Sequence, residues 1–76
     1  MNRDIVEAKV IEGLTMGKQG DIYRYVVEDV EKILIEKALT LARGNQIGAT
    51  KILGINRNTI RMKIRKFGIK ITKFKI

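Results

Sequence analysis

The chain has 76 residues, and its 16 Lys and Arg against 8 Asp and Glu give a formal net charge of +8 at pH 7. It contains neither Cys nor His, which removes the thiolate nucleophile, the soft metal ligands and the commonest general base. We therefore expect no enzyme, no cofactor and no metal site. No apolar run approaches the ~20 residues that span a bilayer, and residues 1–4 do not open a signal peptide, so we expect a soluble, cytoplasmic protein.

The length allows one domain with a thin core. A domain of this size buries only ~60% of the surface that its unfolded chain exposes. Residues 1–76 are therefore expected to form a single domain that gains further burial from a partner subunit.

The charges are segregated along the chain. All eight acidic residues lie at or before Glu36, and residues 1–36 hold only five basic residues, which leaves that part at −3. Residues 37–76 hold eleven Lys and Arg and no acid, or +11. This separation predicts that the second half attracts a polyanion. The alternative is a Lys-rich segment that serves only solubility.

The first predicted element is a helix that begins at Asn2 or Asp4 as N-cap and ends by Gly17. Its apolar residues fall near helical spacing at Ile5, Val6, Ile11 and Leu14. Residues 17–20 then form a short flexible connector.

A second, longer helix is predicted from Ile22 to about Ala42, with Asp21 as its N-cap and Gly44 as the left-handed residue after its end. Its apolar residues cover more than one face, and each large aliphatic left exposed forgoes ~1.5–3 kcal/mol of burial. We therefore predict that residues 4–42 pair with a second copy of the chain, although cover by other helices of the same chain is the alternative. The predicted dimer interface is Tyr23, Val26, Val27, Val30, Ile33 and Leu34.

Residues 45–68 have the pattern of two short helices joined by a tight turn, which is typical of a helix-turn-helix. Asn45 caps a helix that runs to Leu53, residues 54–55 form the turn, and Asn56 caps a second helix that ends at Phe67 before Gly68. The inner positions that would form the shared core are Ala49, Ile52, Leu53, Ile55, Ile60, Ile64 and Phe67.

The outward face of the second short helix carries no carboxylate. At about 100° per residue, Asn58, Met62 and Arg65 lie opposite its apolar side, flanked by Thr59, Arg61 and Lys66. Amide and guanidinium groups hydrogen-bond base edges and phosphates, and a thioether can rest on a thymine methyl. The face therefore predicts a recognition helix in the major groove of DNA. For single residues a local role stays open: Asn56 as a cap, Thr59 in the first turn, and Lys63, Arg65 and Lys66 as a solvated face.

Residues 44–69 resemble the C-terminal helix-turn-helix of the Fis family, which is shared by the nucleoid protein Fis and the NtrC-type activators of sigma-54 transcription. The matching residues are Arg43 to Gln46, Ala49, Leu53 to Arg57, Thr59, Arg61, Lys63 and Phe67 to Ile69. The resemblance continues through Tyr23 to Leu34 and more weakly through Ile5 to Leu14. It implies an all-α, four-helix domain and a homodimer whose core takes two helices from each subunit. It also implies DNA contacts at Asn45, Gln46, Arg57, Thr59, Arg61 and Lys63.

Together these features predict sequence-specific binding of double-stranded DNA. Arg57, Asn58, Arg61 and Met62 would read bases, while Lys51, Arg65, Lys66 and a further candidate, Lys70, would hold phosphates. Ile47 and Gly48 stand where Fis has polar and basic residues, and Met62 replaces a Lys, whereas Asn58 follows the NtrC-type pattern. The resemblance therefore favours the enhancer-binding end of a sigma-54 activator at the bacterial nucleoid, with an ATPase domain and sigma-54 RNA polymerase as partners of the parent protein.

Three alternatives remain. The nearest is a free-standing Fis-like protein that bends DNA. Residues 60–76 are cationic and amphipathic, which also suits a membrane-binding module, and a pure dimerisation module with a basic tail is the third. The basic tail is residues 69–76, of which residues 70–76 read poorly as a helix and are either disordered or a short extended arm.

Overall fold

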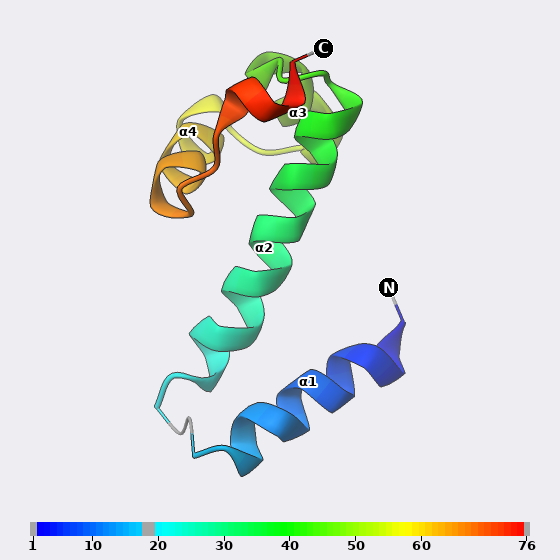
Figure 1. Ribbon diagram of the computed structural model, residues 1–76, viewed down its shortest axis with the longest axis vertical. Coiled ribbons are helices and arrows are strands. Elements are labelled where there is room, and N and C mark those ends of the chain that lie inside the picture. Colours follow the sequence, from blue (N-terminus) through cyan, green and yellow to red (C-terminus); the bar gives the residue numbers. More distant parts are fainter. Residues whose placement is uncertain (1, 18–19, 76) are drawn as a thin grey trace. The chain divides into compact units, whose positions relative to one another are not determined.

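The computed structural model describes residues 2–17 and 20–75. Within these ranges the chain forms four α-helices and one short 3-10 helix and no strand, which confirms the predicted all-α, four-helix fold (Figure 1). The elements are α1 (Arg3–Thr15), α2 (Ile22–Leu41), α3 (Gln46–Leu53), α4 (Arg57–Lys66) and η1 (Ile71–Phe74). Contacts divide the chain within α2 into a first unit that ends at Val30 and a second unit that begins at Glu31.

Asparagine side chains fix the start of three helices. The Asn2 carboxamide oxygen accepts a hydrogen bond from the Asp4 backbone N–H at 2.8 Å, and Asn45 accepts one from the Gly48 N–H at 3.1 Å. Asn56 accepts one from the Asn58 N–H at 2.6 Å. Each bond satisfies a backbone donor that has no partner within the helix, so these helices begin where the sequence predicts.

The end of α2 turns more sharply than the sequence predicts. The helix stops at Leu41, and two consecutive residues, Arg43 and Gly44, then adopt left-handed backbone with φ of 52° and 82°. Gly44 was the expected left-handed residue, whereas Arg43 carries a Cβ that disfavours this conformation. The Gly44 N–H donates to the Leu39 carbonyl at 2.9 Å, which closes the helix and redirects the chain into α3.

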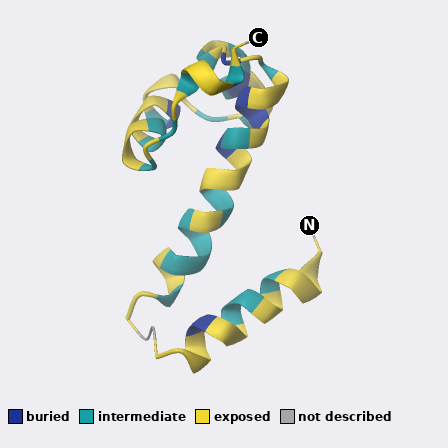
Figure 2. Cartoon of the chain, in the orientation of Figure 1, coloured by how far each residue is buried: buried dark blue, intermediate teal, exposed yellow. Residues whose placement is uncertain are grey.

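The core of the second unit lies where α2 ends beside α3 and α4 (Figure 2). It is formed by Ile35, Ala38 and Leu39 of α2, Ala49 of α3 and Ile60 of α4. The half-buried residues packed against it are Ala42, Leu53, Ile55, Ile64, Phe67, Ile69 and Phe74. The buried and half-buried sets together contain all the inner positions predicted for the helix-turn-helix except Ile52.

The prediction for Ile52 was wrong, because this side chain is 50% exposed. The helix α3 has only eight residues, and it presents Ala49 and Leu53 to the core. At about 100° per residue Ile52 lies a quarter turn from Leu53, on the open side of the helix.

The C-terminal segment 70–75 folds back onto the second unit. It forms η1, and Phe74 packs against the core. The stem of Lys75 lies so close to Gly44 that a Cβ built on Gly44 would be 2.6 Å from Lys75 Cγ. The sequence left a disordered tail and a short extended arm open for these residues. Both expectations were wrong, because residues 71–74 form a helical turn.

The first unit is held by contacts between α1 and the start of α2. Gly13 is buried, and a Cβ at this position would lie 3.1 Å from the Tyr25 ring. Lys9 binds Asp29 and lies 4.1 Å from the Tyr25 ring centroid; the hydrogen bond to Asp29 raises the pKa of Lys9. The predicted apolar stripe of α1 is largely uncovered, since Ile5, Ile11 and Leu14 are all exposed.

Replacing Phe74 tests whether the C-terminal segment is part of the fold. Phe74→Ala should lower the free energy of unfolding by about 2 kcal/mol, below the ~3–5 kcal/mol of a fully buried Phe because the ring is half-buried. The measurement is thermal or urea unfolding followed by circular dichroism. The control is Thr72→Ala, a change at an exposed position of the same turn. Equal stabilities of the two variants would show that the packing of Phe74 contributes nothing to the stability of the fold.

Candidate nucleic-acid interface

The helix α4 separates its side chains into a covered side and an open side. Ile60 is completely buried, and Ile64 and Phe67 are half-buried against the same core. The opposite side is exposed, and Met62 there retains 59% of its accessible surface. The exposed residues of this side are Arg57, Asn58, Arg61, Met62, Arg65 and Lys66. The structure thus has the orientation predicted for this helix, with Ile60 toward the core and Met62 toward solvent.

The first turn of α4 presents Arg57 and Asn58 to solvent, directly after the cap residue Asn56. The side-chain oxygen of Asn56 is occupied by its bond to the Asn58 N–H, so the local role considered for this residue is confirmed. Thr59 is half-buried. This arrangement leaves one guanidinium and one carboxamide projecting from the helix start, where side chains of a recognition helix reach base edges first.

A hollow of about 380 Å³ lies between the start of α3 and the open side of α4. It brings Gln46 together with Arg61 and Arg65, while Ile64, Gly68 and Ile69 complete its lining. One carboxamide and two guanidinium groups thus line a depression without a carboxylate. Such a set of donors suits an anionic oxygen, as on a phosphate.

The remaining predicted contacts on α3 lie at its two ends. Asn45 is exposed and its side chain caps the helix, and Lys51 is exposed in the last turn. The structure therefore gathers Gln46 with the arginines of α4 and places Lys51 at the far end of α3.

Lys63 is turned away from the open side. Its ammonium binds the Glu31 carboxylate of α2 at 2.8 Å, and its side chain is only 21% exposed. The Lys63 Nζ also lies 5.9 Å from the centroid of the Phe67 ring. The cause is helical geometry, because Lys63 comes three residues after Ile60 and therefore lies beside the covered side. The DNA contact expected at Lys63 therefore stays a prediction for a side chain whose ammonium is paired with Glu31.

The charge separation of the sequence becomes a separation between the two units. The second unit carries twelve Lys and Arg against two acidic residues, Glu31 and Glu36. Glu31 is already paired with Lys63. The open side of α4 therefore lies in a strongly positive field.

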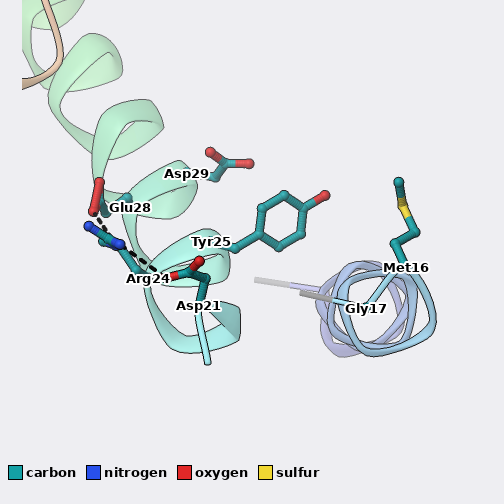
Figure 3. A pocket seen from close by; sticks show the side chains of 7 residues that line it. All are labelled: Met16, Gly17, Asp21, Arg24, Tyr25, Glu28 and Asp29. Atoms are coloured by element: carbon teal, nitrogen blue, oxygen red, sulfur yellow. Dashed lines mark hydrogen bonds and ion pairs between the residues drawn. The ribbon is translucent and has the colours of Figure 1, made fainter. Parts of the chain in front are cut away.

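The first unit has an acidic hollow, which Figure 3 shows between the end of α1 and the start of α2. Its lining is Met16, Gly17, Asp21, Arg24, Tyr25, Glu28 and Asp29. The Arg24 guanidinium lies 3.0 Å from Asp21 and 3.8 Å from Glu28, and hydrogen bonding to Asp21 raises the pKa of Arg24. Three carboxylates repel phosphate, and the described residues contain no group that could hold a metal ion.

The predicted dimer residues are partly open to solvent. Tyr23 is 82% exposed, and Ile33 and Leu34 are also exposed. Val26, Val27 and Val30 are half-buried. Tyr23 of the first unit and Ile33 and Leu34 of the second unit are thus each open to a partner. Among the described residues there is no helix with the length and hydropathy needed to cross a membrane.

Comparison with known proteins gives one matching family and two sets of relatives. A family model described as bacterial regulatory protein, Fis family, matches residues 26–67. The DNA-binding transcriptional regulator NtrC of Azospirillum brasilense is 46% identical over 52 residues, which are 68% of this chain and 11% of that protein. The NtrC of Rhizobium meliloti is 50% identical over 50 residues, 66% of this chain and 10% of that protein.

A second set of relatives is shorter. The DNA-binding protein Fis of Photobacterium profundum is 36% identical over 70 residues, which are 88% of this chain and 71% of that protein. The Fis of Proteus mirabilis is 41% identical over 49 residues, and the chain spans half of its length, against about a tenth for the NtrC proteins. No solved structure matches the chain.

The family match and the structure coincide. Residues 26–67 are more than half of the 76 residues and include most of α2, all of α3 and all of α4. The helix order, the caps and the glycine turn at Gly54 are those expected from the resemblance seen in the sequence. This chain belongs to the Fis family of bacterial regulatory proteins.

Proposed function

We propose that the chain binds double-stranded DNA as a homodimer, with α4 of each subunit in the major groove, and that it serves transcriptional regulation. The observation that carries the proposal is the acid-free open side of α4, opposite the buried Ile60. The relatives named DNA-binding proteins support it. The chain itself is assigned no catalytic role, and its place would be the bacterial nucleoid in the cytoplasm.

The roles of the side chains follow from their positions. Arg57, Asn58, Arg61 and Met62 project from the open side of α4 and would contact base edges. Gln46 and Arg65 line the hollow beside α3 together with Arg61. Gln46 and Arg65 would hold a backbone phosphate there, with further phosphate contacts from Asn45, Lys51, Thr59 and Lys66. Asn56 acts through its cap, and the Lys63 ammonium is paired with Glu31.

A dimer would cover the apolar side chains that α2 leaves exposed. Tyr23, Ile33 and Leu34 are exposed, and Val26, Val27 and Val30 are half-buried. Two symmetric subunits would place two recognition helices about 34 Å apart on a straight duplex, so that a roughly palindromic site is bound. Residues 4–42 would supply the dimer contacts and residues 45–68 the DNA contacts of a single domain.

The biological setting that we favour is the enhancer-binding end of a sigma-54 activator. It is supported by the NtrC relatives, of which this chain corresponds to about a tenth, and by Asn58 after Arg57. The parent protein would then contribute an ATPase domain and the contact with sigma-54 RNA polymerase. A free-standing Fis-like protein is the second candidate, because the Photobacterium profundum Fis aligns over 88% of this chain and 71% of its own length. The length of the parent gene distinguishes these settings.

A membrane-binding role is less well supported. In the described part of the amphipathic stretch, residues 60–75, most large apolar side chains are used by the fold: Ile60, Ile64, Phe67, Ile69 and Phe74 belong to or pack against the core. A helix that uses its apolar side within its own fold has none left to enter a bilayer.

Binding to duplexes at several salt concentrations tests the proposed function. If the dimer neutralises about eight phosphates, log K should fall with log salt at a slope near −7.

Arg57→Ala should cost about 1–3 kcal/mol of binding free energy on a duplex selected from a random pool and little on random DNA, because a base contact is lost. Lys66→Ala should weaken both duplexes alike, because a phosphate contact carries no sequence information. Equal effects of the two changes on both duplexes would contradict the division of roles, and a wild-type protein that ignores duplexes at low salt would refute the function.

The dimer is tested through an exposed residue of α2. Ile33→Asp should convert the protein to a monomer in sedimentation experiments and reduce DNA affinity, because an unpaired carboxylate in an apolar interface is costly. Thr40→Asp adds the same charge at another exposed position of α2 and should leave the dimer intact. A dimer that survives Ile33→Asp unchanged would exclude this face as the interface.

A further inference from the structure

The C-terminal segment 68–75 follows the part of the chain that matches the family, residues 26–67, and yet it is built into the second unit. Phe74 packs against the core, and a Cβ on Gly44 would lie 2.6 Å from Lys75 Cγ and 3.4 Å from the Ile71 carbonyl oxygen. The position of Gly44 therefore requires glycine twice, for its φ of 82° and for the passage of the Lys75 stem. The segment holds its lysines in defined places.

Both ends of this segment border residues proposed to contact DNA. Gly68 and Ile69 line the hollow that holds Gln46, Arg61 and Arg65. At the other end, the stem of Lys75 crosses Gly44, which directly precedes Asn45 in the chain. The exposed Lys75 is thus placed beside the residue that opens α3.

The other two lysines of the segment lie elsewhere. Lys70 and Lys73 line a second hollow of about 320 Å³, together with Lys32 and Glu36 of α2, Phe67 and Phe74. Gly68 and Ile69 border both hollows, so the lysines lie on the other side of these two residues from Gln46, Arg61 and Arg65. A carboxylate shares their surroundings, and no residue proposed to read bases lines that hollow. The segment therefore offers one lysine next to the proposed DNA surface and two beside α2.

We propose that Lys75 is a backbone contact of double-stranded DNA, held next to the start of α3 by the Phe74 anchor and by the close passage of its stem over Gly44, which has no side chain. The inference rests on the proposed function. It extends the DNA surface beyond the helix-turn-helix and assigns no phosphate contact to Lys73.

The test compares Lys75→Gln with Lys73→Gln, which removes the same charge from the same short segment. Duplex affinity is measured between low and physiological salt, and circular dichroism checks that both variants fold like the wild type. Lys75→Gln should reduce the steepness of log K against log salt by about two units per dimer and weaken selected and random duplexes equally. Lys73→Gln should leave the slope unchanged.

The outcomes separate this inference from the function on which it rests. An unchanged slope in Lys75→Gln, or equal losses in both variants, overturns the role of Lys75 while wild-type binding upholds the proposed function. A wild-type protein that binds no duplex overturns both.

A second, independent observation concerns the ion pair between Lys63 and Glu31. The 2.8 Å contact joins α4 to α2, and the two side chains are 21% and 29% exposed. Glu31 is one of only two acidic residues in the second unit. By charge alone, a carboxylate there weakens binding of a polyanion.

We infer that Lys63 is a positioning residue, which fixes the angle of α4 against α2 through Glu31, and that it is not a phosphate ligand. The contact with Glu31 and the nearby Phe67 ring hold its ammonium beside the covered side of the helix. The pair would thereby set how Arg57 and Arg61 meet the base edges.

A double-mutant cycle with Lys63→Met and Glu31→Gln tests this role. Each single change should weaken binding of the selected duplex by about two- to fivefold, the range of a partly exposed ion pair, and lower its preference over random DNA. The double variant should lose no more than either single one, and Lys63→Met should keep the wild-type salt slope. The direction of the change in DNA affinity of Glu31→Gln is diagnostic. By charge alone, removal of this carboxylate would tighten DNA binding, whereas the proposed role predicts weaker binding. Tighter binding by Glu31→Gln would show that the carboxylate acts by its charge alone, and a flatter salt slope in Lys63→Met would make Lys63 a phosphate ligand; either result overturns the inference.

Discussion

The burial of one side of α4 against the end of α2 is the constraint on which the rest of the structure depends. Ile60 and Ala49 are completely buried together with Leu39, and this small set holds three helices at once. In so thin a core each large side chain contributes ~1.5–3 kcal/mol, which is a substantial part of the stability of a small domain. At about 100° per residue Met62 lies on the opposite side of α4 from Ile60. Burial of Ile60 therefore turns Met62 and the neighbouring arginines toward solvent.

The separation of charge works on a longer range than this packing. Twelve basic residues of the second unit act with two acids, one of which is neutralised by Lys63. The first unit carries six acidic residues against four basic ones, and three of its carboxylates pair with Arg24 or Lys9. A polyanion would therefore be attracted to one part of the chain and repelled by the other, which orients an approaching duplex before any specific contact forms.

Local signals in the sequence predicted most of the fold. Asparagine caps and left-handed glycines are determined within three or four residues, so Asn45, Gly54 and Asn56 located α3 and α4. The helical period then predicted which side of α4 is buried. What depends on contacts distant in sequence was not predictable: the partner of Lys63 lies 32 positions earlier in the chain, and the left-handed Arg43 follows from the path into α3. The turn of residues 71–74 is too short for a periodic signal, although the spacing of Ile71 and Phe74 matches its three-residue repeat.

The choice of asparagine at the start of α3 and α4 has an electrostatic consequence. Aspartate caps a helix as well as asparagine does, and its hydrogen bond to the backbone would be the same. It would also place a full negative charge on the partial positive charge of the helix start, and that charge would face an incoming nucleic acid. A neutral carboxamide provides the same local stabilisation and leaves the dipole of each helix uncompensated. In α1, which begins with Asn2 and Asp4 in the acidic unit, no such restriction applies.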